Sequence, residues 1–159
     1  MKRRLLFPAV LSALLVLLGG IDARAQNLAL NRPATGSVAC NASEGPAQAV
    51  NGTVNGGLTD KFCTNVAPGW LQVDLGTAQT IGSFTVRHAG AGGESASFNT
   101  RDFNIQVSPT GSTWTTVVTA TASTGSVTTH TIAAQGARYV RLNVTAASQT
   151  TDATARTRS

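Results

Sequence analysis

The chain has few of the side chains on which catalysis most often depends. Its 159 residues include seven acidic residues, two histidines, two cysteines and one methionine, and charged residues make up 12% of the total. No serine lies in a G-x-S-x-G elbow and no H-E-x-x-H zinc spacing occurs. The one local pair of carboxylates, Glu94 and Asp102, is a weak basis for glycosidase chemistry, because Asp102 begins an expected strand. The sequence therefore predicts a protein that is not an enzyme.

A hydrophobic run long enough to cross a membrane is also lacking. Three basic residues at 2–4 precede an apolar run at residues 5–18, and Ala-Arg-Ala at 23–25 supplies a small-residue cleavage site. This order is typical of a secretory signal peptide cut after Ala25. The alternative, a membrane anchor, needs roughly 20 apolar residues, and Pro8 interrupts this shorter run. We expect a secreted, extracellular chain with no membrane anchor after cleavage.

A cluster of basic residues is missing once the signal peptide is removed. Residues 1–25 hold four of the 12 basic residues and one of the seven acidic residues, so eight and six remain, with a net charge of +2. Nucleic-acid binding usually requires lysine and arginine gathered on one face, and the remaining arginines are scattered. The sequence therefore predicts no nucleic-acid partner. Residues 26–159 have the length of a single domain.

The two cysteines, Cys40 and Cys63, are expected to form a disulfide, because an exported chain folds in an oxidising compartment. Metal ligation by this pair is the weaker alternative, since no histidine and no third cysteine lies nearby in the sequence.

Apolar residues alternate with polar ones over most of the mature chain. In GWLQVDLG, Leu71, Val73 and Leu75 alternate with Gln72 and Asp74. Alternation of this kind is typical of half-buried strands, and no amphipathic helix of 12 residues is evident. The pattern predicts an antiparallel β-sandwich or jelly roll, with irregular loops over residues 41–57. Similar strand patterns occur at residues 81–88, 103–107, 113–122 and 140–144.

One stretch contains many of the charged and hydrogen-bonding side chains of the chain: RHAGAGGESASFNTRDF, at residues 87–103. A histidine, a glutamate, an aspartate, two arginines and an asparagine fall within it, separated by glycines and small residues. Glycines 90, 92 and 93 would let such a loop bend without side-chain clashes. The composition leaves three interpretations: an active site, a loop that binds a ligand, or a turn that carries polar side chains without a function.

Five segments together resemble the coagulation factor V/VIII type C domain, also called the discoidin domain. The resemblance runs from about residue 27 to residue 156, and its nearest bacterial relatives are galactose-binding-like carbohydrate-binding modules. It implies an eight-stranded jelly roll whose loops at one end hold the ligand without catalysis, in bacteria most often a sugar. The segments are NLALNRPATGS at 27–37, QAVNGTVNGG at 48–57, GWLQVDLGTAQTIGSFTVRH at 69–88, DFNIQVSPTGSTWTTV at 102–117 and ARYVRLNVT at 137–145.

The resemblance implies that the polar loop contacts the ligand. Sugar-binding members use a histidine, an arginine, an asparagine and an aromatic ring on such loops. His88, Glu94, Asn99 and Arg101 are the corresponding hydrogen-bonding candidates, and Phe98 is the candidate platform for the apolar face of a sugar. The alternatives are that Arg101 pairs with a neighbouring acid and that Phe98 covers the core.

Other aromatic and histidine side chains are expected to have structural roles. Trp70 and Trp114 begin or flank strands and are interpreted as packing residues, although either could serve as a sugar platform. His130 lies in SVTTHTIAA, where we expect a solvent-facing strand position without a chemical role.

The resemblance also implies a structural calcium ion, weakened or lost in this chain. The segment AVNGTVNGGLTDKF places Asn51 where relatives carry an aspartate, with Thr59 and Asp60 at the positions of later ligands. Calcium prefers oxygen ligands, and the missing negative charge at Asn51 should reduce its affinity. The alternative interpretation of this segment is an Asn-Gly turn.

The sequence thus predicts a secreted carbohydrate-binding module for a galactoside-type or related glycan. Two alternatives stay open: an extracellular adhesion or interaction domain for protein or lipid, and a fragment of a larger secreted glycoside hydrolase. In the family, a final strand follows a segment like TDATAR, whereas here only three residues follow Arg156. We therefore expect a domain truncated at its C-terminal strand, with an open sheet edge and marginal stability.

Overall fold

The structure is a computed structural model that describes residues 26–55, 57–150 and 157–158; the predicted signal peptide lies outside them. The described part consists almost entirely of antiparallel strands joined by turns and short 3-10 helices, which confirms the predicted all-β class. The strands are β1 (Ala34–Gly36), β2 (Cys63–Thr64), β3 (Gly69–Arg87), β4 (Asp102–Ser108), β5 (Thr115–Ala120), β6 (Val127–Ala146) and β7 (Thr157–Arg158). The 3-10 helices are η1 (Ala42–Glu44), η2 (Pro46–Val50), η3 (Gly57–Thr59), η4 (Ala89–Gly92) and η5 (Ala96–Phe98).

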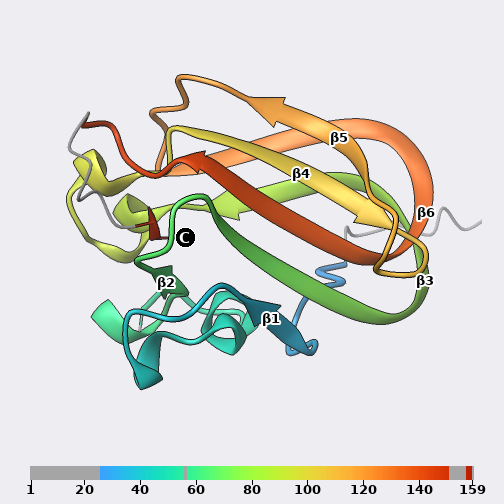
Figure 1. Cartoon of the computed structure of the whole chain (residues 1–159), viewed down its shortest axis with the longest axis horizontal. Coiled ribbons are helices and arrows are strands. Elements are labelled where there is room, and N and C mark those ends of the chain that lie inside the picture. Colours follow the sequence, from blue (N-terminus) through green and yellow to red (C-terminus); the bar gives the residue numbers. More distant parts are fainter. Residues whose placement is uncertain (1–25, 56, 151–156, 159) are drawn as a thin grey trace, which may run out of the picture.

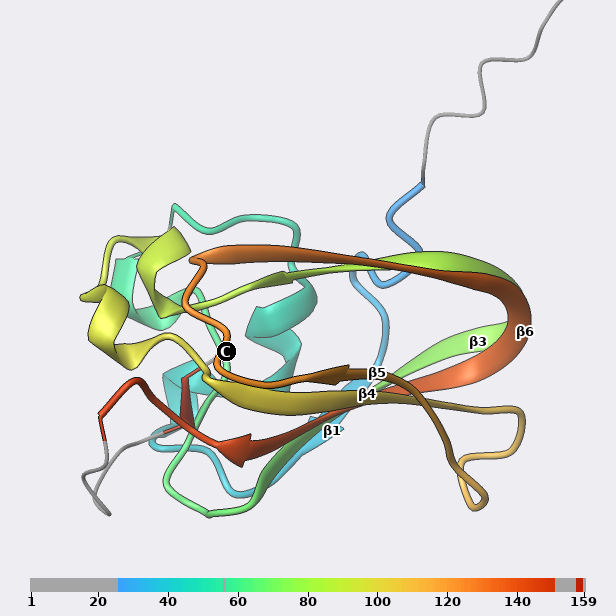
Figure 2. The same ribbon diagram turned by 90° about the horizontal axis from the view of Figure 1, so that it is seen from above.

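Two long strands, β3 and β6, connect the two layers of a sandwich. They pair antiparallel from Gly69 opposite Val144 to Arg87 opposite Val127, within a sheet of order β1-β3-β6-β4-β5. Both strands bend over together, so that the first half of β3 lies in one layer with β4 and β5, and its second half lies in the other (Figures 1 and 2).

The bend explains why the sequence pattern indicated two strands where the structure has one. The register of β3 on β6 shifts between Asp74 and Gln79 and again between Ile81 and Ser83. Such irregularities insert unpaired residues and increase the local bend of a strand. Gly76, at φ +84°, occupies the turn in the backbone, a conformation that glycine adopts without a steric penalty.

The core fills the space between the layers with the alternating apolar residues that the sequence indicated. Phe103 and Ile105 of β4 are 1% and 2% exposed and pack against Val118 of β5. Phe84, on the second half of β3, packs against this cluster from the other layer. Burial of each large apolar side chain contributes on the order of 2 kcal/mol, so these contacts hold the two layers together. A second cluster comprises Val50, Val73, Leu75, Ile81, Val107 and Ala137.

The irregular segments gather at one end of the sandwich, at the left in Figure 1, which we call the loop end. It contains η1, η3, η4, η5, β2 and residues 147–150, which follow β6. The expected irregular stretch 41–57 contains two complete short 3-10 helices and the first residue of a third. The described helices are short, and none has the length and apolar character of a membrane span. The β4–β5 turn, with Gly111, lies at the opposite end (Figure 1).

The two cysteines are bonded to each other, as the sequence predicted. Cys40 precedes η1 and Cys63 forms half of β2, and their Cα atoms are 5.4 Å apart. The bond fastens the segment after β1 to the strand β2, beside Phe62, which is 1% exposed. It therefore fixes one side of the loop end.

One side of β3 has no neighbouring strand over much of its length. β1 pairs with Leu71, Gln72 and Val73, and no other described strand pairs with that side. The short strand β7 pairs instead with β2, opposite Cys63 and Thr64. The second half of β3 thus forms an edge of the described sheet.

Replacing both cysteines, Cys40→Ala with Cys63→Ala, should lower the free energy of unfolding by about 3 kcal/mol, because the bond closes a loop in the unfolded chain. Urea denaturation of the oxidised wild-type protein and the double variant measures this difference. Reduced wild-type protein is the control and should approach the double variant. Equal midpoints for all three would contradict a stabilising role of the disulfide.

Candidate functional site

The polar loop after β3 is held in place from inside by Asn99. This side chain is fully buried; its Oδ1 accepts the N–H of Gly90 at 2.8 Å, and its Nδ2 donates to the carbonyl of Thr124 and the hydroxyl of Ser126. A Cβ at Gly90 would collide with the hydroxyl of Ser126, so a larger residue there would force that side chain to move. Both polar atoms of the Asn99 side chain, Oδ1 and Nδ2, therefore form hydrogen bonds inside the protein and are not at the surface.

His88, the first residue of this loop, lies inside the sandwich. His88 is only 2% exposed. The Nε2 atom of its ring is 3.1 Å from the hydroxyl of Thr128, and the ring centroid lies 5.5 Å from that of Phe103. Burial, and secondarily the nearby His130, lowers the pKa of His88 to about 4. The imidazole is therefore neutral at physiological pH and packs as a core residue.

His130 does not face the solvent, although the sequence predicted that it would. The residue is half-buried, its ring meets the ring of Phe103 edge-on at 5.5 Å, and its Nε2 lies 3.1 Å from the hydroxyl of Thr128. The physical reason is the register of β6 on β3, which pairs His130 with the inward-packing Phe84 and so gives both residues the same face. The structural role assigned to His130 fits this position.

Glu94 takes part in a charged cluster at the loop end. Its Oε1 lies 2.6 Å from the ammonium of Lys61, which also lies 3.4 Å from Glu44 Oε1. Asn41 donates to Glu44 Oε2 at 2.7 Å. The three charged side chains are between 6% and 11% exposed, so their ion pairs are less screened than surface pairs are. The cluster joins three separate segments and carries two negative charges against one positive charge.

Sequence reasoning missed Glu44 and Lys61 as members of this site. They lie 50 and 33 positions before Glu94, and no local spacing connects them. One compositional signal was available: the chain has only two glutamates, and Lys61 is its only lysine after residue 25. All three meet at one place in the fold, which we call the Glu44–Lys61–Glu94 cluster.

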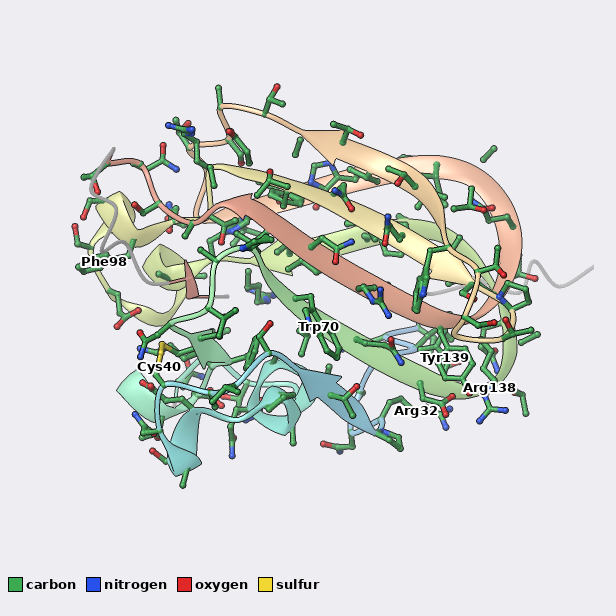
Figure 3. All side chains as sticks on the ribbon, in the orientation of Figure 1. Arg32, Cys40, Trp70, Phe98, Arg138 and Tyr139 are labelled. Carbon is green, nitrogen blue, oxygen red and sulfur yellow. A yellow bond between two sulfur atoms is a disulfide. The ribbon has the colours of Figure 1, made fainter. Side chains whose placement is uncertain are left out.

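Phe98 and Arg101 lie nearer the solvent than the other predicted site residues. Phe98, in η5, is 38% exposed and lies at the extreme of the loop end (Figure 3). Arg101 Nη2 is 3.1 Å from Asp102 Oδ2, and its side chain is 37% exposed. A hydrogen bond from the Ala122 N–H, followed by that from Arg101, lowers the pKa of Asp102. Arg101 thus makes the ion pair that the sequence analysis considered, while a large part of it stays accessible.

The predicted calcium residues are arranged around a turn. Asn51 Oδ1 accepts the N–H of Thr53 at 3.0 Å, and Gly52 follows at φ +88°, which matches the Asn-Gly turn. The Asn51 amide donates to Gln48 Oε1 at 3.2 Å and to the carboxylate of Asp60. Thr59 ends η3 directly before Asp60.

This arrangement does not fit a calcium ion. Calcium takes six to eight oxygen ligands, whereas Asn51 presents an N–H group to Asp60 and uses its oxygen for Thr53. A second group of possible metal ligands, Cys40, Glu44 and Cys63, has its two sulfur atoms joined in the disulfide. The hydrogen bonds of Asn51 hold together the segment that a cation would otherwise organise.

The two tryptophans pack around an arginine on the outer face of the β1-β3-β6-β4-β5 layer. The guanidinium carbon of Arg141 lies 5.2 Å from the ring of Trp70 and 3.9 Å from the ring of Trp114. Arg141 also donates to Gln72 Oε1 at 2.9 Å, and burial lowers its pKa. Trp70 lies near the middle of the molecule, away from Phe98 (Figure 3), and both rings stack on Arg141.

The described chain is thus a two-layer β-sandwich with polar and aromatic side chains on loops at one end. The family model described as "NedA-like, galactose-binding domain", of the F5/F8 type C group, matches residues 48–142. The chain belongs to this family, as the sequence resemblance indicated. Among proteins of curated function, none matches the chain.

Solved structures of carbohydrate-binding modules share the fold. Chitosan-binding module 1 from the chitosanase/glucanase of Paenibacillus sp. IK-5 is 31% identical, with a TM-score of 0.64 over 77% of this chain and 88% of that one. Chitosan-binding module 2 of the same enzyme, in complex with chitotriose, is 28% identical, with a TM-score of 0.65 over 83% and 93%. The family 32 module of Streptococcus pneumoniae EndoD is 26% identical, with a TM-score of 0.69 over 81% and 92%.

Acid should destabilise the protein through His88. Its folded-state pKa of about 4 lies below the ordinary value of 6.5, so the unfolded chain binds more protons between these values. Stability should therefore be complete above pH 6.5 and should fall by up to about 1.4 kcal/mol per pH unit toward pH 4. Asp74, whose pKa Arg138 lowers from 3.8 to about 2, contributes only at still lower pH.

Thermal melting between pH 4 and pH 7 tests this pH dependence, with His88→Gln expected to flatten the slope and His130→Gln expected to keep most of it. The Gln side chain retains a hydrogen-bonding group for Thr128 without a charge that titrates in this range. An unchanged slope in His88→Gln would show that another group is responsible.

Calcium should not stabilise the native chain, because the amide of Asn51 already satisfies Asp60. We expect the same melting temperature in excess chelator and in millimolar calcium. In Asn51→Asp, two carboxylates would face each other, so this variant should melt lower in chelator and regain stability with calcium. A fall in the wild-type melting temperature on chelation would contradict this account of the turn.

Proposed function

We propose that this chain is a secreted, non-catalytic carbohydrate-binding module that takes its ligand at the loop end. The observation that carries the proposal is the convergence of Glu44, Lys61 and Glu94 at the end of the molecule where Phe98 is exposed. The signal peptide expected at residues 1–25, the disulfide and the carbohydrate-binding relatives support an extracellular location.

The side chains at this end supply the two kinds of contact that a sugar requires. The guanidinium of Arg101, with a side chain 37% exposed, can donate to sugar hydroxyl and ring oxygens, while the Glu44–Lys61–Glu94 cluster, with side chains 6% to 11% exposed, gives this end its charge. Phe98 offers an aromatic face for the apolar C–H groups of a sugar ring. His88 and Asn99 act differently in this proposal: they hold the loop in position from inside.

The charge of the site favours an amino sugar as the first ligand class. Two carboxylates outnumber one ammonium in the Glu44–Lys61–Glu94 cluster, so a protonated amino group would be attracted to it. Two of the similar structures are chitosan-binding modules, one of them in complex with chitotriose. A galactoside-type glycan, as the family's name suggests, is the second candidate, since its hydroxyls could use the same hydrogen-bonding groups.

Calorimetric titration of residues 26–159 with chitotriose and with galactose, alongside a glycan array, tests the proposal. Phe98→Ala should weaken binding of the preferred sugar by about tenfold, which corresponds to about 1.4 kcal/mol. Glu94→Gln should weaken chitotriose more than galactose, because it removes a negative charge. Chitotriose binding should also fall as salt is added.

Two arginines provide a matched control for these titrations. Arg101 and Arg138 are both partly exposed and each pairs with an aspartate, but Arg138 lies at the opposite end of the molecule (Figure 3). Arg101→Ala should weaken sugar binding and Arg138→Ala should not. Equal loss in both variants, or no binding to any glycan, would reject the loop-end site and favour the adhesion alternative.

A further inference from the structure

The outer face of one sheet layer carries a continuous row of polar side chains. This layer is formed by β1, the first half of β3, the second half of β6, β4 and β5, and Figure 1 shows it in front, with no helix lying over its strands. The strand register places one polar residue of each strand side by side, and at about 4.8 Å per strand the row spans roughly 19 Å. In the order of the strands, the row consists of Thr35, Gln72, Arg141, Gln106 and Thr116.

Hydrogen bonds between side chains hold this face in one arrangement. Arg141 Nη2 donates to Gln72 Oε1 at 2.9 Å. Asn143, on β6, donates to Gln106 Oε1 at 2.8 Å and to Asn104 Oδ1 at 2.9 Å. The amide nitrogens of Gln72 and Asn104 have no acceptor among the described residues and are not buried. Both can therefore donate to a ligand on this face.

The two tryptophans add aromatic surface to the same face. The rings of Trp70 and Trp114 lie 5.2 Å and 3.9 Å from the guanidinium carbon of Arg141. Both residues are half-buried, so part of each stays exposed. The turn between β4 and β5, which ends at Trp114, bends away from the opposite layer and stands out from the face (Figure 2). Aromatic rings beside hydrogen-bonding amides are the two kinds of group that recognise a sugar.

The positive charge of Arg141 is not balanced by a described carboxylate. The five strands of the sheet contain two acidic residues, Asp74 and Asp102, and each is paired with its own arginine, Arg138 or Arg101. Arg141 is half-buried, and its Nε is buried without a hydrogen-bond partner in the described part of the chain. Buried charges are normally paired, because the loss of hydration is otherwise uncompensated. An anionic ligand on this face would supply the missing charge.

A carbohydrate suits this face better than a peptide does. An extended peptide is commonly recognised through the free backbone edge of a strand. Here β3 and β4 both pair with β6, which lies between them, so a ligand on this face meets side chains and not free backbone groups. Amides spread over several strands, together with aromatic rings, match a ligand that carries hydroxyl groups on an apolar ring. A uronic acid has both features and also the carboxylate that Arg141 requires.

We propose that the outer face around Arg141 is a second carbohydrate-binding site, which takes a uronic acid of an acidic polysaccharide. The guanidinium of Arg141 binds the carboxylate, Trp70 and Trp114 contact the apolar side of the sugar ring, and the amides of Gln72 and Asn104 donate to hydroxyl oxygens. The Glu44–Lys61–Glu94 cluster has an excess of negative charge, so the two sites favour sugars of opposite charge. The inference goes beyond the loop-end proposal and does not depend on it.

Tryptophan fluorescence reports on this face directly, because the chain has only two tryptophans and both contact Arg141. The probe is trimannuronate, a trisaccharide of uronic acids, titrated at neutral pH into the mature protein, residues 26–159. The neutral control is β-1,4-mannotriose, which has a hydroxymethyl group in place of each carboxylate. We expect a saturable fluorescence change with trimannuronate that weakens as salt is added, and at least tenfold weaker binding of mannotriose.

Arg141→Gln is the decisive variant, because it removes the charge and keeps an amide that can donate to Gln72. It should weaken trimannuronate binding at least tenfold. The matched control is Arg87→Gln, which removes the same charge at an exposed position on the second half of β3 and should leave binding within twofold. Affinities are measured by calorimetry, so that an altered tryptophan environment does not affect the comparison. If Arg141→Gln fails to fold in circular dichroism, Trp114→Ala replaces it, with the same tenfold loss expected.

Four results would overturn the proposal: no fluorescence change at millimolar trimannuronate, equal binding of mannotriose, undiminished binding in the decisive variant, or an equal loss in Arg87→Gln. A hexaglutamate peptide that binds as tightly and displaces trimannuronate would also overturn it, because the partner would then be an acidic peptide. Competition by chitotriose would contradict the proposal by placing the acidic sugar at the loop end. Failure of chitotriose to bind would count against the loop-end proposal alone.

Discussion

The pairing of β3 with β6 is the interaction on which the rest of the structure depends. It runs from Gly69 to Arg87 through the bend and joins both layers of the sandwich. Because β3 leaves the sheet at Arg87 and β6 enters it at Val127, the segments after and before them meet at the same end. Asn99 can therefore bond to Thr124 and Ser126 across 25 and 27 residues of sequence, and the polar loop is held against the sheet.

The same pairing divides the roles of the loop's polar residues. Side chains directed back toward the sheet, such as His88 and Asn99, are buried and make internal hydrogen bonds. Glu94 instead meets residues from η1 and from the segment after η3, which produces the Glu44–Lys61–Glu94 cluster. The proposed ligand site and its internal support thus come from different residues of one stretch, and polar composition alone does not distinguish them.

The sequence predicted the class of fold because alternation is a local property of each strand. It also predicted the disulfide from the redox compartment, and the family from five ordered segments. It did not predict the continuity of β3 through its bend, since the register shift after Asp74 interrupts the alternation. Glu44 and Lys61 were missed, and His130 was expected at the surface, because these positions depend on contacts between distant segments that no local pattern records.

The central claim is that the loop end, with the Glu44–Lys61–Glu94 cluster and Phe98, is where a sugar binds. Nuclear magnetic resonance titration of ¹⁵N-labelled protein with a chitosan oligosaccharide tests it most directly, because every backbone amide reports at once. The account predicts shift changes confined to residues 41–44, 61–66 and 94–101, with the amides around Arg138 unchanged. Changes centred on Trp70 and Trp114, or none at saturating chitosan and galactoside concentrations, would contradict it.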